Sequence, residues 1–243
     1  MIFIFSFSAI ISRNFIEIKQ PDNAKTIISQ SINWIADIQK VSFVIIEQNA
    51  NPQSANKQSL DNLLPFKNIE INDDQLQLSQ NDLSKYLLTK ITNDIYQNGH
   101  SVLKGEKISN EYFTNKNAYF IKNFYNFISI KHLDSLQIIY KLSIGILILV
   151  SIFLIYYNIN KSLAIIGIGI AASVIPIFLF SIFISISSKL FFPSNNLILY
   201  YQKYLNEFTN AIQQTGLIIL GVSVLIIFTG WLINNFLFDK SID

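Results

Sequence analysis

The residues that could do chemistry in this sequence are few and far apart. His100 and His132 are the only two histidines, and neither stands in an HExxH-like or other metal-ligand spacing. His132 and Asp134 form an H-x-D triplet, but residues two apart point away from each other on a helix. The sequence therefore predicts a solvated juxtamembrane turn here rather than a metal site.

Two further stretches invite a chemical interpretation. Asp73 and Asp74 in EINDDQ resemble the start of a calcium loop, yet the remaining oxygen ligands are missing, which favours a helix start or a solvated turn. The aromatic cluster YFIKNFYNFISI, residues 119–130, could stack nucleic-acid bases. With only Lys122 and Lys131 nearby, it is predicted to pack in a domain core or at a membrane interface.

The wider composition adds no catalytic or cofactor signal. The chain shows no G-x-S-x-G, P-loop, dinucleotide fingerprint or pair of catalytic carboxylates. Cysteine is absent, which excludes disulfides, thiolate zinc sites and cysteine nucleophiles. The net charge of +2 comes from scattered lysines rather than a basic stripe, so nucleic acid is not an expected partner. We expect no enzyme and no cofactor.

The chain is too apolar for an ordinary soluble domain, because 51% of its 243 residues are hydrophobic and only 14% are charged. The charges are unevenly placed. Residues 13–134 hold 13 Lys and Arg and 13 Asp and Glu, which leaves 5 basic and 3 acidic residues for the last 109 positions. A polar part therefore precedes a membrane part.

The membrane part, residues 136–243, contains three predicted transmembrane helices at about 136–157, 163–188 and 216–238. Each is close to or above the 20 or so apolar residues that cross a bilayer of about 30 Å. Only residues 158–162 separate the first two helices, so they are predicted to form an antiparallel hairpin.

Small residues within these helices are candidates for close helix packing. Pro176 could also mark the broken helix of a transporter, but no polar ligands accompany it, so packing is favoured. The candidate packing residues are Gly167, Gly169, Ala171, Ser173, Pro176, Gly221 and Gly230.

The segment between the last two predicted spans, residues 189–215, is polar enough to lie outside lipid. Within it, apolar residues recur at helical spacing and predict an amphipathic helix at about 194–213. Packing of this helix against the polar domain is favoured over a place on the membrane surface, because Lys203 is its only basic residue.

The polar part, residues 19–135, is predicted to be a mainly helical domain. Helices are expected from Asp22 onward, over Ser79–Asn98 with a capping-box spacing and a closing Gly99, and over about 110–130. Residues 41–47 could form either helix or strand, and residues 49–60 are predicted to be an exposed loop.

The first 18 residues are predicted to be an N-terminal anchor that is short or truncated. MIFIFSFSAIIS reaches only about 18 Å as a helix, less than the hydrocarbon thickness of about 30 Å. A cleaved signal peptide and an unrelated apolar terminus remain the alternatives, although the segment has no basic n-region.

With such an anchor, the chain is an all-α, multi-pass protein of the cell membrane. Residues 19–135 and 189–215 are then extracytoplasmic and the C-terminus is cytoplasmic, an orientation that the distribution of lysines favours only slightly.

This layout resembles a loose group of uncharacterised bacterial four-span membrane proteins. They share an N-terminal anchor, a helical extracytoplasmic domain of about a hundred residues after the first span, and the hairpin, outer helix and last span that follow. The resemblance covers nearly the whole chain but rests on no motif, and it carries over no catalytic residue. Claudin-like proteins share the four spans, but their paired loop cysteines and W-x-x-W type motif are absent here.

The sequence favours an integral membrane scaffold, sensor or accessory subunit. Its expected partners are the lipid bilayer and a protein bound by the extracytoplasmic domain. A small transport or channel component is the alternative, and a homo-oligomer is compatible with either function.

Overall fold

A computed structural model describes residues 1–35, 38–50, 66–67, 69, 71–103, 115–157, 159–191 and 196–235. This part of the chain is helical, and its one pairing of extended residues is an isolated antiparallel bridge between Phe66 and Leu103. The chain forms two compact units, which we name the membrane unit, residues 1–16 and 134–243, and the polar unit, residues 17–133. The all-α prediction is confirmed for the described residues.

The membrane unit contains the helices α1 (Ile2–Lys19), α8 (Leu133–Tyr157), α9 (Ile159–Phe191) and α10 (Asn196–Ile233). The last residues of α1 and the first of α8 belong to the polar unit. Segments of three helices are long and apolar enough to cross a membrane: Leu133–Tyr157, Lys161–Phe183 and Phe208–Ile233. These confirm that the chain is a multi-pass membrane protein.

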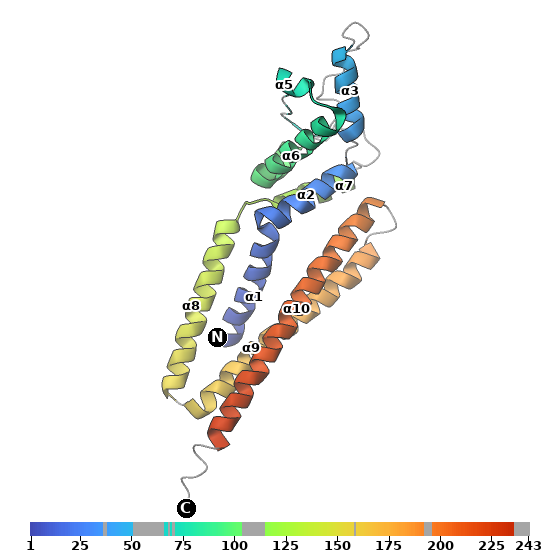
Figure 1. Ribbon diagram of the computed structural model, residues 1–243. Coiled ribbons are helices and arrows are strands. Elements are labelled where there is room, and N and C mark those ends of the chain that lie inside the picture. Colours follow the sequence, from blue (N-terminus) through green and yellow to red (C-terminus); the bar gives the residue numbers. More distant parts are fainter. Residues whose placement is uncertain are drawn as a thin grey trace, which may run out of the picture. The chain divides into compact units, whose positions relative to one another are not determined.

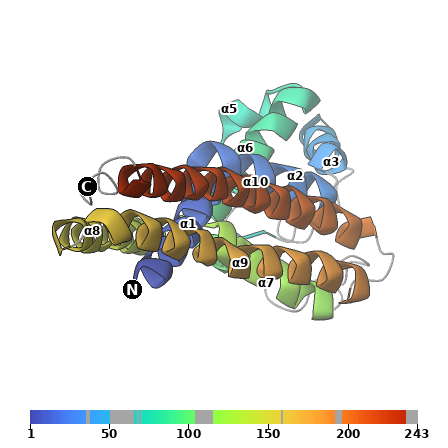
Figure 2. The same cartoon turned by 90° about the horizontal axis from the view of Figure 1, so that it is seen from below.

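The helices α9 and α10 lie side by side along their length, as Figures 1 and 2 show from two directions. α8 ends at Tyr157 and α9 begins at Ile159, so residues 159–162 of the predicted turn already belong to α9. α8 has little contact with the other helices. Only 6% of the residues in its most apolar stretch are buried. Most of its apolar surface therefore faces the bilayer.

The prediction of two separate elements at 194–213 and 216–238 is wrong in its boundary, because α10 runs unbroken from Asn196 to Ile233. The polar side chains near the boundary between the two predicted elements find hydrogen-bond partners within the continuous helix and on α9. Gln213 donates to the Ser181 hydroxyl over 2.6 Å, and Thr215 donates to the Ala211 carbonyl over 3.0 Å.

The apolar stripe of residues 194–213 was predicted to pack against the polar domain, and its two described members, Phe208 and Ile212, have partners in the membrane unit. Ile212 is buried in a cluster with Ile10 and Ile177, against which Phe208 also packs. The ring of Phe208 stacks on that of Phe15 with centroids 6.0 Å apart. Both residues therefore pack within the membrane unit, because α1 presents apolar side chains to them.

The polar unit is built from α2 (Pro21–Ile35), α3 (Ile38–Ala50), α5 (Asp73–Leu76), α6 (Gln80–Asn98), the 3-10 helix η1 (Gly99–Val102) and α7 (Asn115–Ile128). Residues 41–47 are helical, which decides between helix and strand for that segment. The predicted loop overlaps the end of α3 at residues 49–50, and the rest of it lies outside the described residues. The predicted helix at 110–130 corresponds to α7, and residues 110–114 also lie outside the described residues.

The core of the polar unit surrounds α6, which contacts α2, α3, α7 and η1. Its predicted inner face is fully buried and consists of Leu83, Leu87, Ile91 and Ile95. Ser79 is the N-cap and accepts a hydrogen bond from the Asp82 amide, as the capping-box spacing predicted. Gly99 ends the helix with φ at 62°, a backbone conformation that favours glycine.

Candidate functional site

Gly167 lies at a close approach of α9 to α10. A β-carbon at this position would lie 2.5 Å from Cγ1 of Ile227 and 3.0 Å from the carbonyl oxygen of Ser223. Glycine therefore lets the two backbones come together, as small residues do between transmembrane helices.

Gly169, one helical half-turn further, receives α1 instead. A β-carbon there would lie 2.8 Å from Cγ2 of Ile2. The first turn of α1 thus rests on the backbone of α9.

The glycines of α10 differ from one another. Gly230 lies against α9, where a β-carbon would come within 2.9 Å of Leu163 Cβ. Gly216 is similarly close to Val174, with a distance of 3.0 Å to its Cγ1. A β-carbon at Gly221 would meet no atom within 4 Å, so this predicted packing residue lies on an open face of its helix.

The remaining predicted packing residues lie along α9. Ser173 is fully buried, and its hydroxyl donates to the Ile170 carbonyl over 2.6 Å. Ala171 and Pro176 are half-buried, and the helix continues through Pro176 without interruption. α9 is therefore not broken at Pro176, unlike the discontinuous helices of transporters.

α1 packs against both α9 and α10 through its apolar side chains. Ile10 is buried with Ile177 and Ile212. Around these three lie the half-buried side chains of Phe7, Ile11, Phe208 and Ile219.

Polar side chains also join α1 to its neighbours. The hydroxyls of Ser143 on α8 and Ser8 are 3.0 Å apart and hydrogen-bonded. The buried Asn14 donates from Nδ2 to the Ile10 carbonyl over 2.8 Å and accepts from Thr215 on α10 at 3.4 Å. Such bonds add specificity to helix association in an apolar medium.

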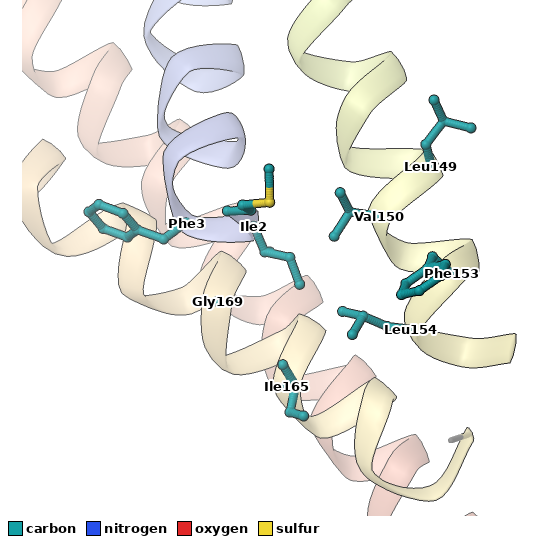
Figure 3. Close-up of a pocket in the computed structure, with 9 residues that line it drawn as sticks. Ile2, Phe3, Leu149, Val150, Phe153, Leu154, Ile165 and Gly169 are labelled. Atoms are coloured by element: carbon teal, nitrogen blue, oxygen red, sulfur yellow. The ribbon is translucent and has the colours of Figure 1, made fainter. Parts of the chain in front are cut away.

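An apolar cleft of about 770 Å³ lies between α1, α8 and α9 (Figure 3). Its walls come from residues 1–3 at the start of the chain, from Leu149, Val150, Phe153 and Leu154 of α8, and from Ile165 and Gly169 of α9. In Figure 3, Val150 and Leu154 point from α8 toward Ile2. All nine lining residues are apolar or glycine, so the cleft offers no side-chain ligand to a polar solute.

The polar unit contains a buried ammonium group bound by three carbonyl oxygens, which we name the Lys19 clasp. Nζ of Lys19 donates to the backbone carbonyls of Phe127, of Ser129 at 2.8 Å and of Lys131 at 3.0 Å. The Lys19 side chain is only 4% exposed. An ammonium has three hydrogens, so each of the three carbonyls receives one.

The end of α7 explains why a cation belongs at this place. α7 ends at Ile128, and the last carbonyls of a helix lack partners within the helix and carry partial negative charge. Lys19 reaches them from more than a hundred residues away in the sequence. Its ammonium therefore acts as a C-terminal cap that also joins the two ends of the polar unit.

Tyr96 on α6 closes the same arrangement. Its hydroxyl donates to the Lys19 carbonyl over 3.1 Å, and its own carbonyl accepts from the Ile130 amide at 2.8 Å. The Lys25 ammonium lies 5.5 Å from the centre of the Tyr96 ring. Both the side chain and the main chain of Lys19 are thus fixed.

Burial changes the proton equilibria of the Lys19 clasp. Removal from water lowers the pKa of Lys19 to about 8, because burial disfavours the charged form. Burial also raises the pKa of the Tyr96 hydroxyl, whose charged form is the phenolate. At neutral pH the lysine is therefore mostly an ammonium and the tyrosine a neutral donor.

The structure does not bring the sequence-predicted chemical residues together. His100 Nδ1 donates to the Asn126 side-chain oxygen over 2.5 Å, whereas His132 is exposed, with φ at 65°. Asp134 is exposed in the first turn of α8, and Asp73 and Asp74 are exposed in the first turn of α5. No group of three or more metal-ligating side chains occurs among the described residues.

The sequence interpretation missed Lys19 as a site residue. Its one local signal is its position at the end of an apolar helix, two residues before Pro21 begins the next helix. Its three acceptors are backbone atoms far along the chain, which no pattern of side chains reveals.

Comparison with protein-family models, curated proteins and solved structures finds no match to this chain. Its function must therefore be argued from its own residues.

Proposed function

We propose that the protein is an integral membrane scaffold, sensor or accessory subunit whose polar unit binds a partner protein outside the cytoplasm. The apolar helices hold the chain in the bilayer. α1 acts as a fourth membrane helix, a role supported by the burial of Ile10 between α9 and α10. The C-terminus then lies in the cytoplasm.

The observation that carries this proposal is an exposed aromatic side chain on the polar unit. Phe43 on α3 is 54% exposed, although the same unit buries a well-formed core next to it, including Val41 and Ile45. Exposed aromatic side chains are typical anchors of protein interfaces, where they bury large apolar areas. Phe43 is therefore the anchor we assign to the partner contact.

Site-specific photocrosslinking in native membranes tests the contact. A photoreactive amino acid placed at position 39, one helical turn from Phe43, should crosslink the full-length protein to a single partner. The variant Phe43→Ala should lose this crosslink without loss of folding, because an exposed ring contributes little to the core. The matched control Lys85→Ala, at an exposed position on α6, should retain it.

Two results would count against a partner-binding polar unit. One is the absence of any crosslink at position 39. The other is an equal yield of crosslink from the wild-type chain and the Phe43→Ala variant.

The orientation can be tested separately because the natural chain has no cysteine. Single cysteines replacing Lys85 in the polar unit and Lys161 at the start of α9 should react from opposite sides with a membrane-impermeant maleimide. Labelling of Lys85→Cys in intact cells supports the extracytoplasmic position. Labelling of Lys161→Cys in its place reverses the orientation.

A transport or channel function is the alternative, and the apolar walls of the cleft give it no support. Solute flux through liposomes that contain the purified protein would favour it over the scaffold.

A further inference from the structure

The cleft between α1, α8 and α9 is held open at both ends. At one end the Ser162 hydroxyl of α9 donates to the Leu154 carbonyl of α8. Further along α8, the hydrogen bond between Ser143 and Ser8 ties it to α1. α8 is therefore attached to its neighbours at two points, and the cleft lies along the turns of α8 between these points.

The cleft lies inside the membrane-spanning segments. Residues 149–154 are part of the span Leu133–Tyr157, and Ile165 and Gly169 are part of the span Lys161–Phe183. Two of its lining residues are themselves largely exposed, Leu149 at 68% and Phe153 at 67%. The cleft is therefore continuous with the lipid-facing surface.

The chemistry of the walls limits what can occupy this space. A buried water needs two to four polar partners, and the nine lining residues have no polar side chain. An empty space would sacrifice dispersion contacts on every side. A hydrocarbon chain needs no hydrogen bond and is the material that the bilayer supplies at this depth.

The size of the cleft also suits one flexible chain. Its volume of about 770 Å³ falls within the range of about 300–1,000 Å³ that is usual for sites of single small ligands. Gly169 and the first turn of α1 close its inner side, and the outer side is open to the bilayer.

We propose that this cleft is a binding site for one acyl chain of a membrane lipid, bound between α8 and α9 with its end against Ile2. The bound chain completes the contact of α8 with the rest of the membrane unit. This proposal is independent of the partner contact at Phe43.

The test uses the full-length protein in vesicles of dioleoylphosphatidylcholine that contain a small fraction of phosphatidylcholine with a diazirine in one acyl chain. After illumination, mass spectrometry locates the labelled residues. We expect the lining residues Leu149, Val150, Phe153, Leu154 and Ile165 to carry more label than two exposed residues of α10. These are Leu217 and Ile218, which are 60% and 69% exposed.

Two substitutions on α8 separate a bound chain from passing lipid. Val150→Phe places a ring in the cleft and should abolish the excess label there. Ile148→Phe adds a ring on the opposite face of the same helix and should leave the excess unchanged. Retention of the excess in Ile148→Phe also shows that an added ring on α8 is tolerated.

The proposal is overturned if the cleft carries no more label than α10, or if Val150→Phe leaves the excess intact. A single cysteine at position 153 provides a further check. Disulfide-linked dimers of this variant in the same vesicles would show that a second copy fills the cleft, which also overturns the proposal.

Discussion

The Lys19 clasp should become more stable as the pH rises. A lysine whose pKa is raised by oxygen partners would show the opposite dependence, but burial lowers the pKa of Lys19. Its pKa is about 8 in the folded chain and 10.5 in an unfolded one. Between these values the unfolded chain binds more protons, so the stability of the folded form rises with pH. Well below pH 8 both forms are protonated and the dependence vanishes.

The size of the effect follows from the same two values. From pH 7 to pH 9 the folded lysine loses most of its proton while the unfolded one keeps it. The difference in bound protons between the two forms, integrated from pH 7 to pH 9, is about one pH unit. This raises the free energy of opening by about 1 kcal/mol, which is about a tenfold change in the opening equilibrium. The raised pKa of Tyr96 keeps its hydroxyl protonated in the folded chain over this range.

Hydrogen exchange of peptides that contain residues 127–131 measures this equilibrium. The Ile130 amide is bonded to the Tyr96 carbonyl at 2.8 Å and exchanges only when the clasp opens. After correction for the intrinsic pH dependence of exchange, protection should rise about tenfold from pH 7 to pH 9. Lys19→Met should abolish the rise, and Lys85→Met, at an exposed position, should preserve it.

Wild-type protection that stays constant over this range would show that Lys19 does not titrate there. The prediction is refuted equally by a rise of the same size in Lys19→Met, because another group would then be titrating.

Three further predictions concern single contacts. Gly167→Leu should lower the stability of the membrane unit in detergent by about 1–3 kcal/mol because its side chain overlaps α10, whereas Gly221→Leu should have little effect in thermal denaturation. Tyr125→Phe should cost about 1 kcal/mol in denaturant unfolding, because the Ser31 hydroxyl loses a buried partner at 2.9 Å. Tyr96→Phe should remove the loss of stability expected above pH 10, where the unfolded tyrosine ionises and the folded one keeps its proton, as measured by a pH series of melting curves.

Local patterns predicted the elements that depend on local physics. The apolar runs located the membrane helices, and the spacing of Ser79, Asp82 and Gly99 located both ends of α6. In these cases the relevant contacts lie within one or two helical turns, so the sequence carries the information directly.

The features that the sequence did not reveal depend on contacts between distant segments. The sequence was divided into an amphipathic helix at about 194–213 and a span at about 216–238, but Gln213 and Thr215 lie within one continuous helix. Their side chains bond to the Ser181 hydroxyl and to the Ala211 carbonyl. Lys19 looked like an ordinary charge at a helix end, yet it is buried against carbonyls of residues 127–131. Neither outcome follows from periodicity, because each depends on which segment the tertiary fold brings alongside.

The contacts of α1 have a consequence for the way the chain is connected. Ser8 is bonded to Ser143, and Ile2 lies near Val150 and Leu154, so α1 and α8 run antiparallel. Ile16 follows Ser8 by eight residues and Ser135 precedes Ser143 by eight, which places both at the same end of the membrane unit. In sequence, the polar unit is therefore inserted between the antiparallel helices α1 and α8. The Lys19 clasp joins the chain segment that enters this insertion to the segment that leaves it.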